Sequence, residues 1–312
     1  MIGPYFLVGS ERSGTTMLRL MLDGHPDVCF HHEFVYSVDK IKACGEVPDI
    51  NSYLEYLSSD RVFQLDDLKI KQSNNYVEIV RDFLTQIKGK TKKTIVGATV
   101  HRNIRHLPKI WPSCKFIHIV RDPRDVTRSY VNMGWGGHVW VAADAVLKLE
   151  QEWDDFVQTL SEGRFITIKY EDLVADPEKV LSRLCDFIGV SYHNDMLKYS
   201  ENSTYSKPDA SLSHQWKRKA TKYEVSLVEY KLRNMMLKYN YELSGYERPN
   251  VSFITSMVLN IIGRKNRFLF SVRKYGVCLK VLDVLSRRLL PVSSFRGKVQ
   301  NKMNEISNLK IK

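Results

Sequence analysis

The sequence has 312 residues, 43% of them hydrophobic and 26% charged, which is enough apolar material for one large domain or one domain with an extension. Its five cysteines are widely spaced and odd in number, so they favour neither a disulfide framework nor a zinc site. No signal peptide precedes the first predicted strand, and the apolar run 253–263 is too short to cross a bilayer, so we expect a cytoplasmic location.

The first predicted elements, residues 5–24, form a strand, a tight loop and a helix. Tyr5–Val8 is an apolar run, and the apolar residues after Thr16 follow the period of a helix. The glycines at 9 and 14 have the spacing of a loop that binds phosphate through backbone N–H groups and a helix N-terminus. A plain glycine turn is the alternative. A nucleotide triphosphatase would carry Lys where Thr15 stands, so the loop favours an anion but not ATP or GTP hydrolysis.

The chain then alternates strands with helices. Residues 25–39 are predicted as a polar loop that contains Glu33, and residues 50–90 as helical. Strands are predicted at 94–98, 115–120 and 165–170. Helices are predicted after Arg121, over 141–160 and from Pro177 to Gly189. This alternation indicates an α/β fold, a P-loop-like parallel sheet flanked by helices.

Candidate site residues follow successive predicted strands. Arg12 to Thr16, His101, Arg121 and Tyr170 each come directly after or at the end of one strand. In parallel sheets, ligands bind beyond the carboxyl ends of the strands, so these residues are expected to converge. Asp122 and Asp125 are interpreted as residues that orient Arg121 and Arg124 or cap a helix, and no metal site is expected.

The net charge of +12 is concentrated in the C-terminal tail. Residues 251–312 hold thirteen Lys/Arg and two acidic residues, a net of +11, which leaves +1 for residues 1–250. Pro249 and the shift in composition predict a boundary between a domain at 1–250 and a basic helical extension at 251–312.

Several motifs together resemble the sulfotransferases that use 3′-phosphoadenosine 5′-phosphosulfate (PAPS). They are RSGTT after the first strand, HPDV after the first helix, FIHIVRDPRDVTRSY, and KYEDLVADPEKVL followed by LCDFIGV. The resemblance covers residues 5 to about 220 in matching order. Bacterial sulfotransferases are similar, and the tyrosylprotein sulfotransferases share the N-terminal motif.

The resemblance implies specific roles on the cofactor side. Arg12, Ser13, Gly14, Thr15 and Thr16 would hold the 5′-phosphosulfate, with Arg12 on the sulfuryl oxygens. The resemblance also assigns the 3′-phosphate to Arg121 and Ser129, the adenine to Tyr170, and a mobile basic loop over the 3′-phosphate to Lys217 and Lys219.

On the acceptor side the resemblance implies that Glu33 is the general base, which takes the proton of the attacking hydroxyl. A solvated loop glutamate beside His31 and His32 is the alternative. Many relatives carry a Lys in a Gly-x-Lys-Thr-Pro stretch, but this chain has Gly97-Ala-Thr-Val-His101 there. His101 or Arg102 would donate to the leaving oxygen instead, or Arg12 would act alone, and a structural role for His101 stays open.

The predicted function is sulfuryl transfer from PAPS to a hydroxyl, or an amine, of a small-molecule, glycan or lipid acceptor. The alternatives are a P-loop small-molecule kinase and a non-catalytic basic adaptor for anionic polymers or membrane. Nucleic acid is not an expected partner, because few aromatic residues interleave with the basic ones. Contact of the tail with a membrane surface and an anionic acceptor at the tail both stay open, as does the oligomeric state.

Overall fold

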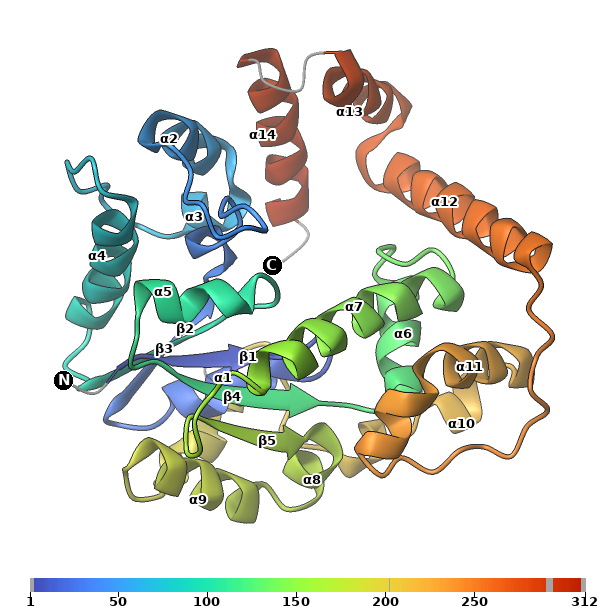
Figure 1. Ribbon diagram of the computed structural model, residues 1–312, viewed down its shortest axis with the longest axis horizontal. Coiled ribbons are helices and arrows are strands. Elements are labelled where there is room, and N and C mark those ends of the chain that lie inside the picture. The colour runs from blue at the N-terminus through green and yellow to red at the C-terminus, as the bar shows by residue number, and fades with distance from the viewer. Residues whose placement is uncertain (1–2, 202, 290–293, 310–312) are drawn as a thin grey trace.

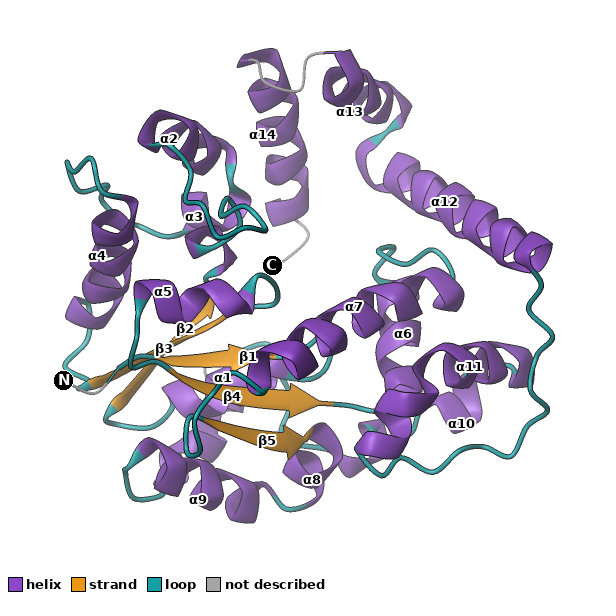
Figure 2. Cartoon of the chain, in the orientation of Figure 1, coloured by secondary structure: helices purple, strands orange, loops and turns teal. Residues whose placement is uncertain are grey.

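The computed structural model, which describes residues 3–201, 203–289 and 294–309, is built on a five-stranded parallel sheet (Figures 1 and 2). The strand order is β2-β3-β1-β4-β5. The strands are β1 (Tyr5–Val8), β2 (Val28–Glu33), β3 (Ile95–Thr99), β4 (Lys115–Val120) and β5 (Phe165–Lys169). The predicted α/β class is confirmed.

Alternate side chains of β1 point to opposite faces of the sheet, and helices cover both of these faces. Tyr5 and Leu7 belong to one buried apolar cluster, which includes residues of helices α1 (Thr15–Asp23) and α9 (Pro177–Ile188). Phe6 and Val8 belong to the other, with residues of helices α4 (Tyr76–Gly89) and α7 (Val139–Val157). A central strand buried on both faces must be apolar throughout, which is what made β1 recognisable in the sequence.

One strand was missed. Residues 28–33, predicted as part of a polar loop, form β2 at the edge of the sheet, paired only with β3. Val28, Cys29 and Phe30 are buried, whereas His31, His32 and Glu33 are partly exposed. An edge strand has one neighbour and buries less, so three apolar residues suffice, and its polar end gave no strand signal.

Capping residues fix several helix ends as the sequence predicts. Asp176 accepts a hydrogen bond from the backbone N–H of Lys179 at the start of α9, and Gly189 ends that helix in the left-handed conformation. Asp122 caps α6 (Pro123–Asn132) in the same way. The other α-helices of the main body are α2 (Ile50–Ser59), α3 (Arg61–Leu65), α5 (Leu107–Ile110), α8 (Tyr170–Ala175), α10 (Trp216–Lys219) and α11 (Lys222–Lys238). Short 3-10 helices are η1 (Val35–Ser37), η2 (Ile104–His106), η3 (Asn194–Glu201) and η4 (Ala210–Leu212).

The basic C-terminal segment forms three helices that arch over one side of the molecule (Figure 1). They are α12 (Phe253–Tyr275), α13 (Val277–Leu289) and α14 (Ser294–Leu309). Asn266 of α12 donates to the carbonyl of Gly137 beside α7, and Asn304 of α14 donates to the carbonyl of Ser59 in α2. Residues 290–293 and 310–312 of the predicted extension lie outside the described residues. Within the described ranges, every helix is too short or too polar to cross a membrane.

Candidate active site

The loop between β1 and α1 leaves a helix N-terminus open to an anion. Gly14 precedes the helix in the left-handed conformation, at φ 96°, and a Cβ there would lie 2.4 Å from the Tyr170 ring, so only glycine fits. No described side chain caps α1, and its first turn holds no acidic residue. The first backbone N–H groups of Thr15 and Thr16 are therefore available to an anionic ligand.

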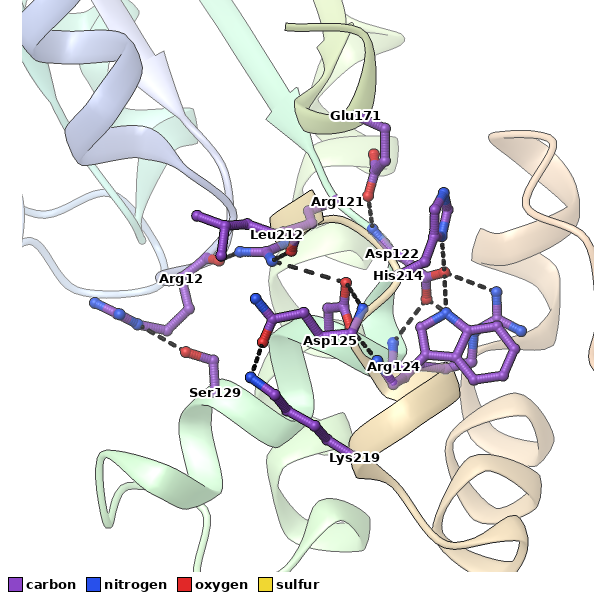
Figure 3. A network of polar contacts seen from close by, with 12 residues as sticks. Arg12, Arg121, Asp122, Arg124, Asp125, Ser129, Glu171, Leu212, His214 and Lys219 are labelled. Atoms are coloured by element: carbon purple, nitrogen blue, oxygen red, sulfur yellow. Dashed lines mark hydrogen bonds and ion pairs between the residues drawn. The ribbon is translucent and has the colours of Figure 1, made fainter. Parts of the chain in front are cut away.

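Two arginines from different strand ends meet at this loop (Figure 3). Arg12 donates from Nε to the hydroxyl of Ser129 in α6, at 3.0 Å. Arg121, at the end of β4, donates to the carbonyl of Arg12 at 3.3 Å and to that of Leu212 at 2.9 Å. Its guanidinium lies 4.1 Å from the centroid of the Tyr170 ring. The structure thus brings Arg12, Gly14, Arg121, Ser129 and Tyr170 together.

The buried polar atoms here fit an anionic group with phosphate or sulfuryl oxygens. The Nε of Arg121 is buried without a hydrogen-bond partner among the described residues. An unpaired buried donor of this kind costs free energy unless a ligand accepts from it, and a guanidinium matches phosphate oxygens in a fork. The donor set of the loop is guanidinium, hydroxyl and backbone N–H, which suits oxyanions and not a cation.

The basic segment around α10 is held by Asp122 and Asp125 (Figure 3). Trp216 donates its indole N–H to Asp122 at 2.9 Å and its backbone N–H to Asp125 at 2.8 Å. The Trp216 ring packs on the Arg124 guanidinium at 3.7 Å, and Arg124 in turn forms a two-point ion pair with Asp122. Both aspartates therefore anchor protein groups, in keeping with the structural interpretation made from the sequence.

The two predicted lysines of this segment lie on different sides. Lys219 donates to the Gln215 side chain and points toward the region of Arg121 and Ser129 (Figure 3). Lys217 lines a separate cavity of about 600 Å³ with Lys169 and His214, which no residue of the loop 9–16 lines. Asp122 contacts His214 and Arg124, which line this cavity. Burial alone would raise the pKa of Asp122, but hydrogen bonds from His214 and Arg124 lower it to about 2, so the carboxylate stays ionised.

Removing the anchor at Asp125 is expected to loosen the basic segment. Asp125→Ala leaves the backbone N–H groups of Gln215 and Trp216 without their acceptor, which should lower the free energy of unfolding by about 1–3 kcal/mol. Urea denaturation measures this change. Asp155→Ala, at an exposed position of α7, is the control and should stay within about 0.5 kcal/mol of wild type. An unchanged stability in Asp125→Ala would contradict the anchoring role.

Glu33 and His101 line a small cavity beside the loop. This cavity, of about 210 Å³, is lined by Thr15, Thr16, Thr99, Glu33 and His101 together with residues of α1, β2 and α3. Glu33 is placed there by a shift in the β2–β3 register between His31 and Glu33. The buried hydroxyl of Thr99 has no hydrogen-bond partner among the described residues, as in a site that a polar ligand completes.

The hydrogen bond of His101 limits its chemistry. Its Nδ1 lies 2.9 Å from the Gly9 carbonyl, which can only accept, so Nδ1 carries the proton. In the neutral imidazole the other nitrogen, Nε2, is then an acceptor, and only an imidazolium would donate from it. Arg102, the alternative donor, forms a two-point ion pair with Asp39 at 2.6 and 2.7 Å. Arg12 is the cation placed directly in the anion loop.

A larger cavity of about 1160 Å³ opens beside Glu33 and His101 and is walled by α2, α3 and α14. Its lining contains acidic and basic side chains in equal number. The acidic ones are Glu11, Glu33, Glu46, Asp49, Glu55 and Asp60, and the basic ones are Lys40, Lys42, Arg61, Arg102, Arg296 and Lys298. This balance does not single out an anionic acceptor, and among the described cations of the tail only Arg296 and Lys298 line the cavity.

Two histidines and an aspartate next to this region form a hydrogen-bonded cluster. The Asp66 carboxylate lies 3.0 Å from His31 Nε2 and 2.8 Å from His32 Nε2, and it accepts from the Tyr36 hydroxyl at 2.7 Å. Such ligand atoms could hold a metal ion. Here each already has a partner within the cluster, and Arg19 and Arg61 line the adjoining cavity, which disfavours a cation. The expectation of no metal stays a prediction.

Comparison with known proteins decides the family. Residues 4–194, well over half of the chain, match the family described as the sulfotransferase family. The chain belongs to the sulfotransferase family. The chain is 25% identical over 216 residues to protein-tyrosine sulfotransferase 1 of Danio rerio, and the match covers 63% of this chain and 56% of that protein. It is 31% identical over 245 residues to the omega-hydroxy-beta-dihydromenaquinone-9 sulfotransferase of Mycobacterium tuberculosis, covering 60% and 63%.

Solved structures show the same fold. The sulfotransferase domain from the curacin biosynthetic pathway superposes with a TM-score of 0.55 at 21% identity, covering 78% of this chain and 99% of that one. The sulfotransferase domain of the Synechococcus PCC 7002 olefin synthase gives a TM-score of 0.55 at 21% identity, covering 77% and 95%. The chain spans less than two thirds of the length of either curated relative named above.

Three features of the site escaped prediction. The anchor residue Trp216, next to the predicted basic loop of Lys217 and Lys219, was not singled out. Neither was Glu11, which accepts a hydrogen bond from Tyr130 and lines the large cavity. The wall contributed by α14 joins residues more than 200 positions apart in the chain. Of these three features, only Trp216 gave a local signal in the sequence. It is a single aromatic residue followed by three basic ones, and a tryptophan in such a run is often buried with its N–H bonded to a partner.

Proposed function

We propose that this sulfotransferase uses PAPS and transfers its sulfuryl group to a hydroxyl of the acceptor, or to an amine. The observation that carries the proposal is the meeting of Arg12, Arg121 and Ser129 beside an uncapped helix N-terminus. Two guanidinium groups and a row of N–H donors suit a co-substrate with separate phosphate and phosphosulfate groups. Membership of the sulfotransferase family favours this reaction over the kinase and adaptor alternatives.

Each group has a proposed role on the cofactor side. The backbone N–H groups at Gly14 to Thr16 and the guanidinium of Arg12 would bind the phosphosulfate, with Ser13 shaping the loop through its bond to Ser10. Arg121 and Ser129 would bind the 3′-phosphate, aided by Lys219 and by Lys217 if the α10 segment moves, and Tyr170 would contact the adenine. Arg12 touches Ser129, so the two phosphate sites would share one continuous set of donors.

On the acceptor side, Glu33 would remove the proton of the attacking hydroxyl. The acceptor oxygen forms a bond to sulfur while the bond from sulfur to the bridging phosphate oxygen breaks, which releases adenosine 3′,5′-bisphosphate. Glu33 and the loop threonines line one cavity, which supports the proposal that a carboxylate near the anion loop takes the proton of the attacking group. Arg12 would stabilise charge on the sulfuryl and leaving oxygens, and His101 would fix the loop through Gly9.

The larger cavity is the proposed entry of the acceptor. Its polar lining of both signs suits a polar acceptor, and its volume of about 1160 Å³ exceeds what a small metabolite fills. The two curated relatives are named for a protein tyrosine and for a hydroxylated menaquinone, so they do not decide between a protein acceptor and the small-molecule, glycan or lipid acceptor expected from the sequence. We further propose that residues 1–250 hold the chemistry, whereas 251–312 form an extension that completes this cavity.

The nucleotide assignment predicts that adenosine 3′,5′-bisphosphate and the 5′-diphosphate ADP stabilise the protein to different extents. Adenosine 3′,5′-bisphosphate should raise the melting temperature more than ADP, because only it places a phosphate on Arg121 and Ser129, an interaction worth about 2 kcal/mol. Thermal denaturation at equal ligand concentrations measures this. In Arg121→Ala the advantage over ADP should vanish, whereas Arg105→Ala, outside the site, should keep it. Equal shifts by both nucleotides in the wild type would rule out the 3′-phosphate site.

A further inference from the structure

Helix α12 has apolar side chains on two opposite faces. On one face Leu259 and Gly263 are buried, and a Cβ at Gly263 would lie 2.6 Å from Val141 of α7, so this face packs against the main body. On the opposite face Ile254, Ile261 and Phe268 are 67%, 53% and 45% exposed. These residues are spaced by seven, which places them on one side of a helix. An exposed apolar stripe opposite the packed face of a helix is typical of a surface that a second partner covers.

Helix α13 repeats the arrangement. Asp283 and Ser286 are buried, and Asp283 binds Lys280, Arg287 and Arg296, which ties this face of α13 to α14. The exposed apolar side chains of α13 are Val277, Val281, Leu282, Leu285 and Leu289. Two consecutive helices therefore each present an uncovered apolar face, which is more than scattered surface residues explain.

The positive charge of the C-terminal segment indicates which kind of partner covers these apolar faces. The segment 251–312 carries a net charge of +11, and Arg264, Lys265, Arg273 and Lys274 lie on the same helix as the exposed apolar face of α12. None of these four lines the large cavity, so the acceptor does not account for them. A second copy of the chain would bring an equal positive charge against the first and be repelled. An anionic surface that also accepts apolar side chains fits both properties.

We propose that α12 and α13 lie on the surface of an anionic lipid bilayer. The exposed isoleucine, valine, leucine and phenylalanine side chains enter the boundary between headgroups and acyl chains, and the Lys and Arg side chains contact lipid phosphates. The helices lie along the surface, because none of the described helices can cross it. This binding is independent of sulfuryl transfer and holds whether or not the proposed reaction is correct.

Vesicle sedimentation with the full chain tests the proposal. Wild type should sediment with vesicles of phosphatidylglycerol and phosphatidylcholine and stay in solution with phosphatidylcholine alone. Binding should fall by about tenfold or more when salt rises from about 0.1 M to about 0.5 M. The double variant Ile254→Asp/Ile261→Asp should bind at least about tenfold more weakly, and so should Arg264→Glu/Lys265→Glu/Lys274→Glu.

A matched control separates this face from general surface hydrophobicity. Leu237 of α11 is 52% exposed, almost the same as Ile261 at 53%, and Leu237→Asp should bind vesicles like wild type. All variants should keep the far-UV circular dichroism spectrum and the melting temperature of the wild type without ligand, which shows that they are folded. Wild type that ignores phosphatidylglycerol vesicles, or an isoleucine variant that binds like Leu237→Asp, would overturn the proposal. So would a wild-type dimer that the isoleucine variant converts to a monomer, since a second copy would then cover the face.

Discussion

Replacing Glu33 by Gln is expected to lower kcat by about 10²–10⁴-fold, while the affinity for the nucleotide stays nearly unchanged, as for loss of a general base. The carboxylate lines the cavity that faces the anion loop, and the amide of Gln keeps its size but cannot take a proton. Initial rates with PAPS and a hydroxyl acceptor give kcat, and the melting shift with adenosine 3′,5′-bisphosphate reports the affinity.

Two other glutamates provide comparison variants for this prediction. Glu55 lines the larger cavity only, so Glu55→Gln should keep kcat within about twofold of wild type. Glu11 also lines that cavity and lies in the loop beside Arg12. Full activity in Glu33→Gln with loss of activity in Glu11→Gln would move the base to Glu11.

Replacing Arg12 by Ala is expected to lower kcat by about 10²–10³-fold and to weaken nucleotide binding as well. Arg12 is the cation of the anion loop, and its contact with Ser129 links the two phosphate sites, so the variant removes both charge stabilisation and positioning. Rates at saturating PAPS separate the effect on kcat from the effect on binding.

Arg102→Ala is the matched control for Arg12. Arg102 lines the large cavity but is paired with Asp39, so its loss should change kcat far less and leave the nucleotide-induced melting shift intact. A loss of kcat in Arg102→Ala as large as in Arg12→Ala would identify Arg102 as the residue that replaces the lysine found in many relatives. His101→Gln extends the comparison, because the amide N–H of Gln can still donate to the Gly9 carbonyl.

The fold was predictable wherever a local pattern reflects burial. Residues of β1, β4 and β5 are short apolar runs bounded by polar turns, and Asp176, Pro177 and Gly189 mark the two ends of α9. Strand β2 could not be found in this way. Its second half faces polar neighbours at the sheet edge, so His31, His32 and Glu33 do not differ locally from a loop.

In the candidate site, too, some contacts could be predicted from the sequence and others could not. The ends of parallel strands meet at one edge of the sheet, so the approach of Arg121 to the loop at Arg12 followed from the strand assignments alone. The anchoring of Trp216 by Asp122 and Asp125 joins residues about 90 positions apart, and no local property of either segment specifies which residues pair. The same holds for the wall that α14 adds to the large cavity.

That wall has a consequence for how this enzyme could diversify. The segment shared with the family ends at residue 194, yet part of the proposed acceptor cavity comes from residues 296–304. Acceptor choice would then depend in part on a stretch of the gene that lies outside the family segment, although most of the cavity wall comes from within that segment. A change in the last helix could alter the acceptor preference while the sulfuryl-transfer machinery stayed intact.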